Sequence, residues 1–358
     1  MNRRNCRIHI DQDALQHNLD RVRHFLEQHG SSSRIMAVIK ANAYGHGMFA
    51  SATALDGADA FAVASAGEAL ALRGQGIDKP LVVLHGFATP EQLQQLAAQA
   101  IQPVVHCQTQ LDVLAAYRGE PVVVWLKIDT GMHRLGIPLA DWRQAVDSIT
   151  ACKQASLAGV MSHFANADNE ENLYNNRQLE EFIKVKYKID APASLANSAA
   201  ICSQPASCFD WVRPGIMLYG ASPLQQHSAA ALGLRPVMHF ESRLIAIQHL
   251  KRGDAVGYGG LWHCPEDMPV GIVAAGYGDG YPRHANAGTP LWVNGQSARL
   301  VGRVSMDSLF ADLRGIKAAV GDPVELWGAR VPVDEVAQNA GTIAYEVLCQ
   351  AGNAAALQ

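Results

Sequence analysis

Long apolar runs are missing from this sequence of 358 residues. No stretch reaches the roughly 18 consecutive apolar residues that a membrane-spanning helix needs. The first residues, MNRRNCRIHIDQDAL, include two arginines but not the apolar segment of a signal peptide, so we expect a cytoplasmic protein. A basic excess is missing as well. The net charge is −4, which argues against a nucleic-acid binder, because such proteins normally present a basic surface.

Metal-binding and disulfide patterns are also absent. The seven cysteines are scattered along the chain without a CxxC pair, and none of the 14 histidines belongs to an HExxH motif. The cysteine pattern predicts free thiols in a reducing compartment rather than a disulfide framework. The histidine pattern predicts that no metal is bound.

What the sequence does contain is an alternation of short apolar runs and helix-length segments. A first amphipathic helix is expected from residue 11 to about residue 30, where apolar residues recur at helical spacing. The expected strands are residues 34–40, 60–65, 81–87, 103–106, 122–129, 157–164, 193–198 and 210–215. Eight strands separated by helices predict an α/β fold, a (β/α)8 barrel of the TIM type. An open doubly wound sheet is disfavoured, because no G-x-G-x-x-G follows the first strand.

The pattern changes near residue 232. Helical segments become rare, and β-rich runs separated by turn residues follow. Asn294 and Gly295 lie between two apolar runs and predict a two-residue hairpin. We therefore expect two domains: a barrel over residues 1–232 and a mainly antiparallel β domain over residues 233–358.

Polar side chains stand at or just after the ends of the expected strands. In a barrel of this type the chemistry lies at the carboxyl ends of the strands, so these side chains should meet at one mouth. They are Lys40 at the end of the first strand with Tyr44 a few residues on, Lys127 and Arg134 with the fifth, His163 with the sixth, Asn197 and Ser198 with the seventh, and Arg213, Gly215 and Ile216 with the eighth. Any one of them is typical of an ordinary polar loop. Together they predict a cationic site that binds an anion.

The combination of one lysine with a phosphate cradle is the outline of a pyridoxal 5'-phosphate site, in which the lysine forms a Schiff base. Ser198 offers a hydroxyl, and Gly215 allows the backbone amides near Ile216 to approach a phosphate closely. Arg213 stands where many such enzymes place a carboxylate. An arginine cannot accept a proton, so the ring nitrogen would stay neutral. That arrangement favours a short-lived carbanion that is promptly reprotonated.

A series of motifs then relates the sequence to a known family. In chain order they are AVIKANAYGHG, LKIDTGMHRLG, SHFANAD, WVRPGIMLYG, VGYGG, GYGDGYPR, VGRVSMD and YEVLC. With these motifs the sequence resembles the alanine racemases over nearly its whole length. The resemblance implies an isomerase that interconverts L- and D-alanine on pyridoxal 5'-phosphate, either to supply D-alanine for peptidoglycan or to degrade alanine. It also implies a homodimer in which each β domain completes the active site of the partner.

The resemblance implies a role for each matching position. Lys40 would hold the cofactor as an internal aldimine and act as the base for D-alanine, and Tyr258 of the partner subunit would be the base for L-alanine. The other implied cofactor contacts are Tyr44, His163, Asn197, Ser198, Arg213, Gly215, Ile216 and Tyr345. The implied substrate contacts are Arg134 and the backbone of Met306. Supporting roles fall to Lys127, which many members carry as a carbamate, to Tyr277 in a narrow access corridor, and to Asp307 beside it.

Three other functions compete with this hypothesis. A pyridoxal phosphate decarboxylase of the same architecture would release carbon dioxide, but Tyr258 and Tyr277 argue against it. A non-catalytic cofactor carrier would not need a second domain. A racemase with broader amino-acid specificity is expected to carry an export signal, which this sequence lacks.

Overall fold

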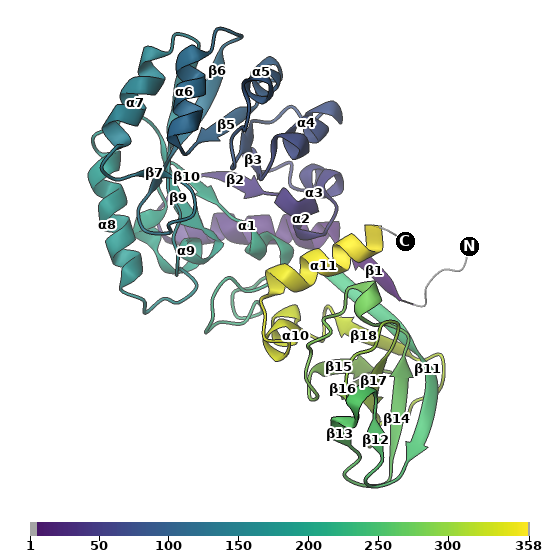
Figure 1. Cartoon of the computed structure of the whole chain (residues 1–358). Helices are drawn as coiled ribbons and strands as arrows, with labels where there is room; N and C mark the ends of the chain where they lie inside the picture. The colour runs from purple at the N-terminus through teal and green to yellow at the C-terminus, as the bar shows by residue number, and fades with distance from the viewer. Residues whose placement is uncertain (1–5, 357–358) are drawn as a thin grey trace.

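The computed structural model describes residues 6–356, and its first large unit is a closed barrel of parallel strands (Figure 1). The barrel strands are β2 (Arg34–Val38), β3 (Ala60–Val63), β4 (Leu81–Val83), β5 (Gln102–Val105), β6 (Val122–Asp129), β8 (Ala155–Met161), β9 (Ala193–Asn197) and β10 (Trp211–Arg213). Their spatial order is β5-β4-β3-β2-β10-β9-β8-β6, and a β5–β6 pairing closes the ring. The predicted (β/α)8 barrel is confirmed, and all eight expected strands are present. A two-residue strand, β7 (Ile137–Pro138), pairs with the end of β6.

Helices surround this barrel. They are α1 (Gln12–Gln28), α2 (Lys40–Tyr44), α3 (Met48–Ala54), α4 (Ala66–Gly74), α5 (Pro90–Ala98), α6 (Gln108–Ala116), α7 (Trp142–Ala151), α8 (Tyr174–Lys186) and α9 (Ser198–Ser203), with the short turns η1 (Pro205–Ser207) and η2 (Ile216–Tyr219). Helix α1 begins as the sequence predicts, because the Asp11 side chain accepts a hydrogen bond from the Ala14 amide. Its apolar stripe from Leu15 to Leu26 is buried. No helix in the described part of the chain is long and apolar enough to cross a membrane.

The second unit is built on an antiparallel sheet of seven strands. They are β1 (Arg7–Ile10), β11 (Met238–Leu250), β14 (Met268–Val273), β15 (Pro290–Val293), β16 (Gln296–Val301), β17 (Leu309–Asp312) and β18 (Pro323–Trp327). A small ribbon, β12 (Ala255–Val256) with β13 (Trp262–His263), extends from it and encloses the turn η3 (Tyr258–Gly260); a further turn is η4 (Tyr277–Asp279). The predicted hairpin is confirmed: Asn294 and Gly295 join β15 to β16 with positive φ angles of 45° and 79°.

The two units share chain segments. Strand β1 pairs with the first residues of β11, so the segment that precedes α1 lies in the antiparallel sheet rather than in the barrel. The chain then enters the barrel through α1 and returns to the sheet at β11. The division of the chain at residue 232 stays a prediction.

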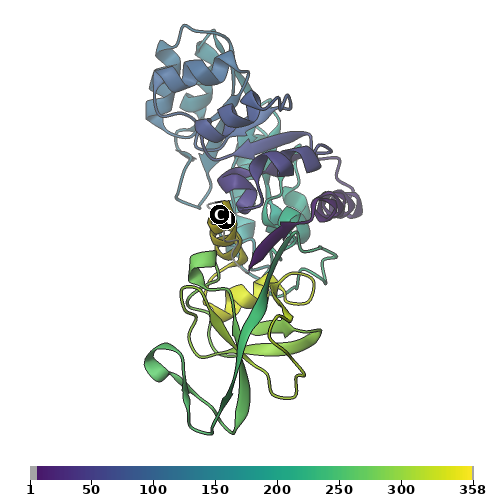
Figure 2. The same cartoon turned by 90° about the vertical axis from the view of Figure 1, so that its right-hand side faces the viewer.

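The C-terminal helices lie between the barrel and the antiparallel sheet in both views (Figures 1 and 2). They are α10 (Val333–Asn339) and α11 (Ala344–Ala356). Helix α11 contacts α2 on the barrel and both β1 and η4 on the other unit. The segment after the last strand therefore returns to the barrel mouth, where the predicted site lies.

Candidate active site

A cavity of about 780 Å³ opens at the carboxyl ends of the barrel strands. Its lining brings together all the residues that the strand ends predicted, and Tyr345 of α11 joins them. The predicted residues in the lining are Lys40, Tyr44, Lys127, Arg134, His163, Asn197, Ser198, Arg213, Gly215, Ile216 and Tyr345. The residue that follows the first barrel strand, Lys40, thus meets Tyr345 of the last helix at one mouth.

Lys40 stands on a left-handed turn, and here the prediction that it ends the first strand is wrong. Strand β2 ends at Val38, and Lys40 begins α2. The four residues that follow it, Ala41 to Tyr44, all have φ angles between 52° and 54°. Each non-glycine residue in this conformation costs about 1–2 kcal/mol, so contacts from the surrounding structure must hold the turn in place.

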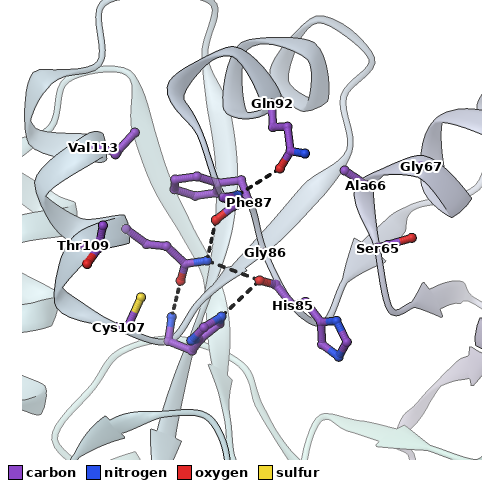
Figure 3. Close-up of a pocket in the computed structure, with 13 residues that line it drawn as sticks. Ser65, Ala66, Gly67, His85, Gly86, Phe87, Gln92, Cys107, Thr109 and Val113 are labelled. Atoms are coloured by element: carbon purple, nitrogen blue, oxygen red, sulfur yellow. Dashed lines mark hydrogen bonds between the residues drawn. The ribbon is translucent and has the colours of Figure 1, made fainter.

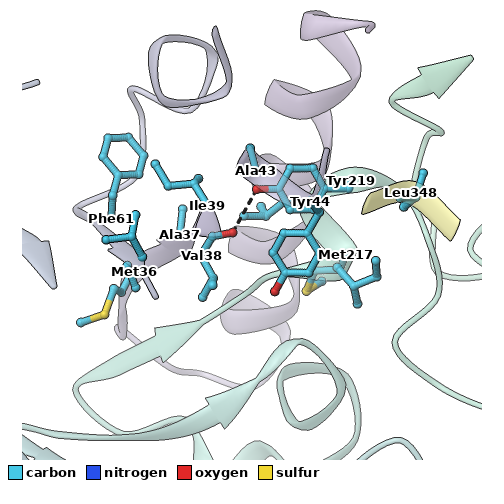
Figure 4. Close-up of a cluster of buried hydrophobic side chains, with 14 of the residues drawn as sticks. Met36, Ala37, Val38, Ile39, Ala43, Tyr44, Phe61, Met217, Tyr219 and Leu348 are labelled. Atoms are coloured by element: carbon cyan, nitrogen blue, oxygen red, sulfur yellow. Dashed lines mark hydrogen bonds between the residues drawn. The ribbon is translucent and has the colours of Figure 1, made fainter. Parts of the chain in front are cut away.

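Aromatic rings hold the far end of this turn. Tyr44 stacks on Tyr219 with ring centroids 4.7 Å apart, and His46 stacks on Tyr219 at 4.6 Å. The Tyr219 hydroxyl donates a hydrogen bond of 3.0 Å to the carbonyl of Val38 (Figure 4). His46 Nδ1 lies 2.9 Å from the Ala43 carbonyl oxygen, so this nitrogen carries the proton that is donated. The turn is thereby tied at its end to the last residue of β2.

Positive charge dominates the cavity. Burial, followed by the charge of Arg134, lowers the pKa of Lys40. Burial, followed by Arg213 and Arg134, lowers the pKa of Lys127 to about 8. Both shifts favour the neutral amine, and both are expected where several cations share a partly buried site. An anionic ligand would relieve this repulsion.

Arg213 is anchored by side-chain and backbone acceptors. Its guanidinium donates hydrogen bonds of 2.5 Å to the Ser194 hydroxyl oxygen and 2.5 Å to the Ser162 carbonyl oxygen. It also donates to His163 Nδ1 at 3.3 Å, which places the histidine proton on Nε2. Burial, followed by the charge of Arg213, holds the pKa of His163 well below its ordinary value. His163 is therefore a neutral ring beside a fixed cation.

An anion cradle lies next to this pair. The Gly215 amide donates to the Ser198 hydroxyl oxygen at 2.7 Å, and the Met217 amide lies 3.5 Å from the same oxygen. Because the oxygen accepts from the backbone, its own hydrogen is available to a ligand in the cavity. A Cβ on Gly215 would lie 2.4 Å from the Tyr44 hydroxyl oxygen, so a larger residue there would displace the Tyr44 side chain. The hydroxyls of Ser198 and Tyr44 therefore both lie next to Gly215 in the cavity.

Comparison with known proteins agrees with this geometry. Residues 10–223 match the family model described as the N-terminal domain of alanine racemase, and residues 237–357 match that of its C-terminal domain. The chain belongs to the alanine racemase family. The two models cover almost the whole chain, so the main functional prediction, an isomerase of this family, is supported over the alternatives.

Relatives and solved structures of alanine racemases agree along nearly their full lengths. The alanine racemase of Nitrosococcus oceani is 52% identical over 347 residues, which is 95% of each chain. That of Halorhodospira halophila is 48% identical over 354 residues, 97% of this chain and 95% of that one. The structure of the biosynthetic alanine racemase from Pseudomonas aeruginosa superposes with a TM-score of 0.93 at 42% identity, covering 98% of this chain and 97% of that one.

Four predicted residues of the racemase site do not line the cavity of their own chain. Tyr258, Tyr277, Met306 and Asp307 lie on loops of the antiparallel unit, and none of them is in the lining. Tyr258 is 69% exposed and Met306 is 54% exposed. The Tyr277 amide donates to the Ser305 carbonyl at 3.0 Å, which brings two of these loops together. The four residues share one unit of the chain, but not the site of Lys40.

Two histidines in the lining were missed by the sequence analysis. His85 and His106 follow β4 and β5, so the rule that selected Lys127 at a strand end would also have found them. They also line a second cavity of about 400 Å³ beside the first (Figure 3). His106 Nε2 lies 3.0 Å from the carbonyl oxygen of His85, so the tautomer with hydrogen on Nε2 is favoured. The two cavities thus share one wall.

Proposed function

We propose that the cavity holds pyridoxal 5'-phosphate through Lys40 and that this racemase inverts alanine with two proton-transfer groups, Lys40 and Tyr258 of the partner subunit. The observation that carries the proposal is the placement of a partly buried lysine among Arg134, Arg213 and Lys127, next to an anion cradle. Such a donor set suits a phosphorylated aldehyde, because the amine can bond to the aldehyde while hydroxyls and amides bind the phosphate.

The lining residues fit this cofactor. Ser198, Tyr44 and the amides at the start of η2 near Ile216 would bind the phosphate, and Tyr345 reaches the same cavity from α11. When bound, pyridoxal 5'-phosphate supplies the electron sink that makes the Cα proton of alanine acidic. Arg213 would face the ring nitrogen and His163 and Asn197 the ring, and a guanidinium cannot accept a proton from that nitrogen.

The chain's own residues would carry the proton transfers. The lowered pKa of Lys40 favours the neutral amine, which can accept the Cα proton of D-alanine. Inversion requires a second group on the opposite face of the substrate. Tyr258 of the partner subunit would supply it, facing the guanidinium of Arg213 and the neutral ring of His163.

Substrate binding falls to Arg134, which would bind the alanine carboxylate together with the backbone of Met306 of the partner subunit. Lys127 would orient Arg134. Its pKa of about 8 leaves neutral amine near physiological pH, and carbamate formation with carbon dioxide requires that form. Carbon dioxide labelled with carbon-13 should then give a carbamate signal that the Lys127→Ala variant lacks.

A homodimer with shared sites is part of the proposal. Tyr258, Leu261 and Met306 are more than half exposed on the antiparallel unit, and large exposed apolar groups of this kind suit a surface that a partner covers. Tyr277 and Asp307 would lie at the access corridor of the partner's cavity. None of the cysteines in residues 6–356 forms a disulfide, which favours a reducing compartment and a cytoplasmic location.

The purified enzyme tests this proposal. With added pyridoxal 5'-phosphate it should convert L-alanine to an equal mixture of enantiomers, followed by circular dichroism. Lysine and ornithine should give no carbon dioxide. Release of carbon dioxide and an amine without racemisation of alanine would contradict the proposal in favour of the decarboxylase alternative.

A further inference from the structure

Glu68 connects the turn that carries Lys40 to the neighbouring helix. It lies in the first turn of α4, where it forms a capping box with Ser65. Its Oε2 atom accepts hydrogen bonds from the amides of Ser65 at 2.9 Å and Ala64 at 2.8 Å, and the Ser65 hydroxyl lies 3.3 Å away. A capping box accounts for the hydrogen bonds of Oε2. It does not account for the hydrogen bond of Oε1.

The second carboxylate oxygen leaves the helix. Glu68 Oε1 accepts a hydrogen bond of 2.7 Å from the amide of Ala41, the residue directly after Lys40 and 27 positions away in sequence. Ala41 is also the first of the four left-handed residues. The bond therefore holds the peptide group between Lys40 and Ala41, where the left-handed residues begin.

Other side chains hold the residues on either side of the Ala41 amide. Tyr44 and His46 stack on Tyr219 at the far end of the turn, the Tyr219 hydroxyl bonds the Val38 carbonyl oxygen before the turn, and the Asn42 side chain accepts a hydrogen bond from the Met48 amide after it. Glu68 belongs to α4, and its Oε2 atom is fixed by the amides of Ala64 and Ser65 directly before that helix. Its Oε1 atom therefore holds the Ala41 amide at a set position relative to α4. Lys40 is thus held between β2 on one side and the start of α4 on the other.

Glu68 also brings a negative charge to a cationic mouth. Arg134 and Arg213 lower the pKa of Lys40, and the carboxylate of Glu68 raises it, as does the thiolate form of Cys349 on α11. The effect of burial is larger than any of these, and it lowers the pKa. The same Glu68 carboxylate therefore bonds the Ala41 amide and raises the pKa of Lys40.

We propose that Glu68 is a positioning residue for Lys40, fixing the direction of the lysine through the Ala41 amide. The inference rests on the proposed role of Lys40 as the cofactor-bound base. Glu68 does not touch the substrate. It acts through the turn, and its loss should affect the step that uses Lys40 more than the step that uses Tyr258 of the partner subunit.

The test compares Glu68→Gln with two control variants of the full-length enzyme. Glutamine has the same length, but one of its two terminal atoms is an NH2 group, which cannot accept from an amide. It therefore loses either the Ala41 bond or the helix cap, together with the charge. Ser65→Ala weakens the cap and leaves the Ala41 bond. Glu91→Gln removes a carboxylate from the first turn of the next helix, α5, away from Lys40.

Two measurements are made on each variant. The first is the rate at which the full-length apoenzyme captures pyridoxal 5'-phosphate as a function of pH, which reports the amine of Lys40. The midpoint should move to lower pH in Glu68→Gln, because removal of a nearby carboxylate disfavours the protonated amine. The second is exchange of the Cα proton with deuterated solvent. Exchange from D-alanine should slow on the order of tenfold relative to exchange from L-alanine, since small misplacements of a catalytic group are costly.

Glu68→Asp keeps the charge but is too short to bridge both elements. It should retain the wild-type midpoint and still slow exchange from D-alanine, so the proposal can be tested even if Glu68→Gln does not fold. If Glu68→Gln and Glu68→Asp both behave like Ser65→Ala, with a lower unfolding temperature, a wild-type capture midpoint and equal effects on the two enantiomers, Glu68 is only a helix cap and the inference is wrong. Failure of the proposed function looks different: a Lys40→Ala enzyme would then still capture the cofactor covalently.

Discussion

Gly352 of α11 lies directly against Gly45, with no side chain between the two backbones. A Cβ on Gly352 would lie 2.0 Å from the Gly45 carbonyl oxygen, and a Cβ on Gly45 would lie 2.4 Å from the carbonyl oxygen of Leu348. Helix α11 therefore rests on the end of the Lys40 turn. The same helix, which carries the cavity-lining Tyr345, also meets the residue directly after η4: a Cβ on Gly280 would lie 2.5 Å from the Cα of Ala351.

The first prediction concerns this backbone contact. Gly352→Ala should destabilise the enzyme by about 1–3 kcal/mol, because the added methyl group overfills a closed contact between backbones. The displaced helix should also weaken cofactor binding. Thermal unfolding and cofactor titration measure the two effects. Gly74→Ala is the matched control, since Gly74 also lies in a helix and a Cβ there would have no neighbour within 4 Å. Equal stability of the two variants would contradict the role of the contact.

The second prediction assigns the covalent residue. Lys40→Ala should abolish the absorbance band of the bound cofactor, because no amine remains at the turn. Lys127→Ala should keep the band, although Lys127 lines the same cavity and its pKa of about 8 also leaves it partly neutral. Absorbance spectra of the two purified variants with added pyridoxal 5'-phosphate decide between the lysines. A band that survives in Lys40→Ala and vanishes in Lys127→Ala would exchange their roles.

Much of this architecture could be predicted because its signals are local. Each barrel strand is a short apolar run, and Lys127 and Arg213 interrupt or end such runs, so position along the chain predicted that they meet at the mouth. The left-handed turn could not be predicted in this way. Ala41 and Ala43 have no intrinsic preference for positive φ, and the contacts that hold them come from Glu68 and Tyr219, far away in sequence.

Two other features depend on distant partners. The pairing of β1 with β11 joins segments more than 200 residues apart, and nothing in four residues of β1 indicates which strand they meet. Tyr258 is exposed and lies outside the cavity of its own chain. Only the family resemblance pointed to it, since no local signal distinguishes this exposed tyrosine from an ordinary residue of a glycine-rich turn.

The third prediction concerns pH and stability. Burial raises the pKa of Asp334 from its ordinary 3.8 to about 6, although its carboxylate accepts hydrogen bonds from the Ser222 amide. The folded state therefore binds the proton more tightly than the unfolded state. The stabilisation from this group is present at low pH and is lost as the pH rises from about 4 through about 6. At neutral pH the charged carboxylate should cost roughly 3 kcal/mol.

Asp334→Asn tests this sign. The asparagine oxygen can still accept from Ser222, but the side chain carries no charge. The variant should be more stable than the wild type above pH 6, and the difference should shrink toward pH 4, as measured by denaturant unfolding across this range. Asp147→Asn, at an exposed position of α7, is the control. If Asp334→Asn were instead less stable than the wild type at neutral pH, and this deficit disappeared toward pH 4, the charged carboxylate would be stabilising.

The last prediction tests the second proton-transfer group and its location on another subunit. Tyr258→Phe should slow proton removal from L-alanine by about 10²-fold or more, the usual size of a general-base contribution, and should affect D-alanine much less. The control is Tyr187→Phe, because Tyr187 is 77% exposed and outside the lining of the cavity.

Mixing then locates the tyrosine. Heterodimers of a Lys40→Ala chain and a Tyr258→Phe chain contain one site in which Lys40 and Tyr258 are both intact, provided that each site draws these residues from different subunits. Each homodimer has two defective sites, so racemisation should reappear on mixing and approach half of the wild-type rate per heterodimer. If both residues instead served the same chain, every site in the heterodimer would lack one of them, and no activity would return. A verified heterodimer that stays inactive would therefore contradict shared sites, while the loss seen in Tyr258→Phe alone would still identify the tyrosine as a base.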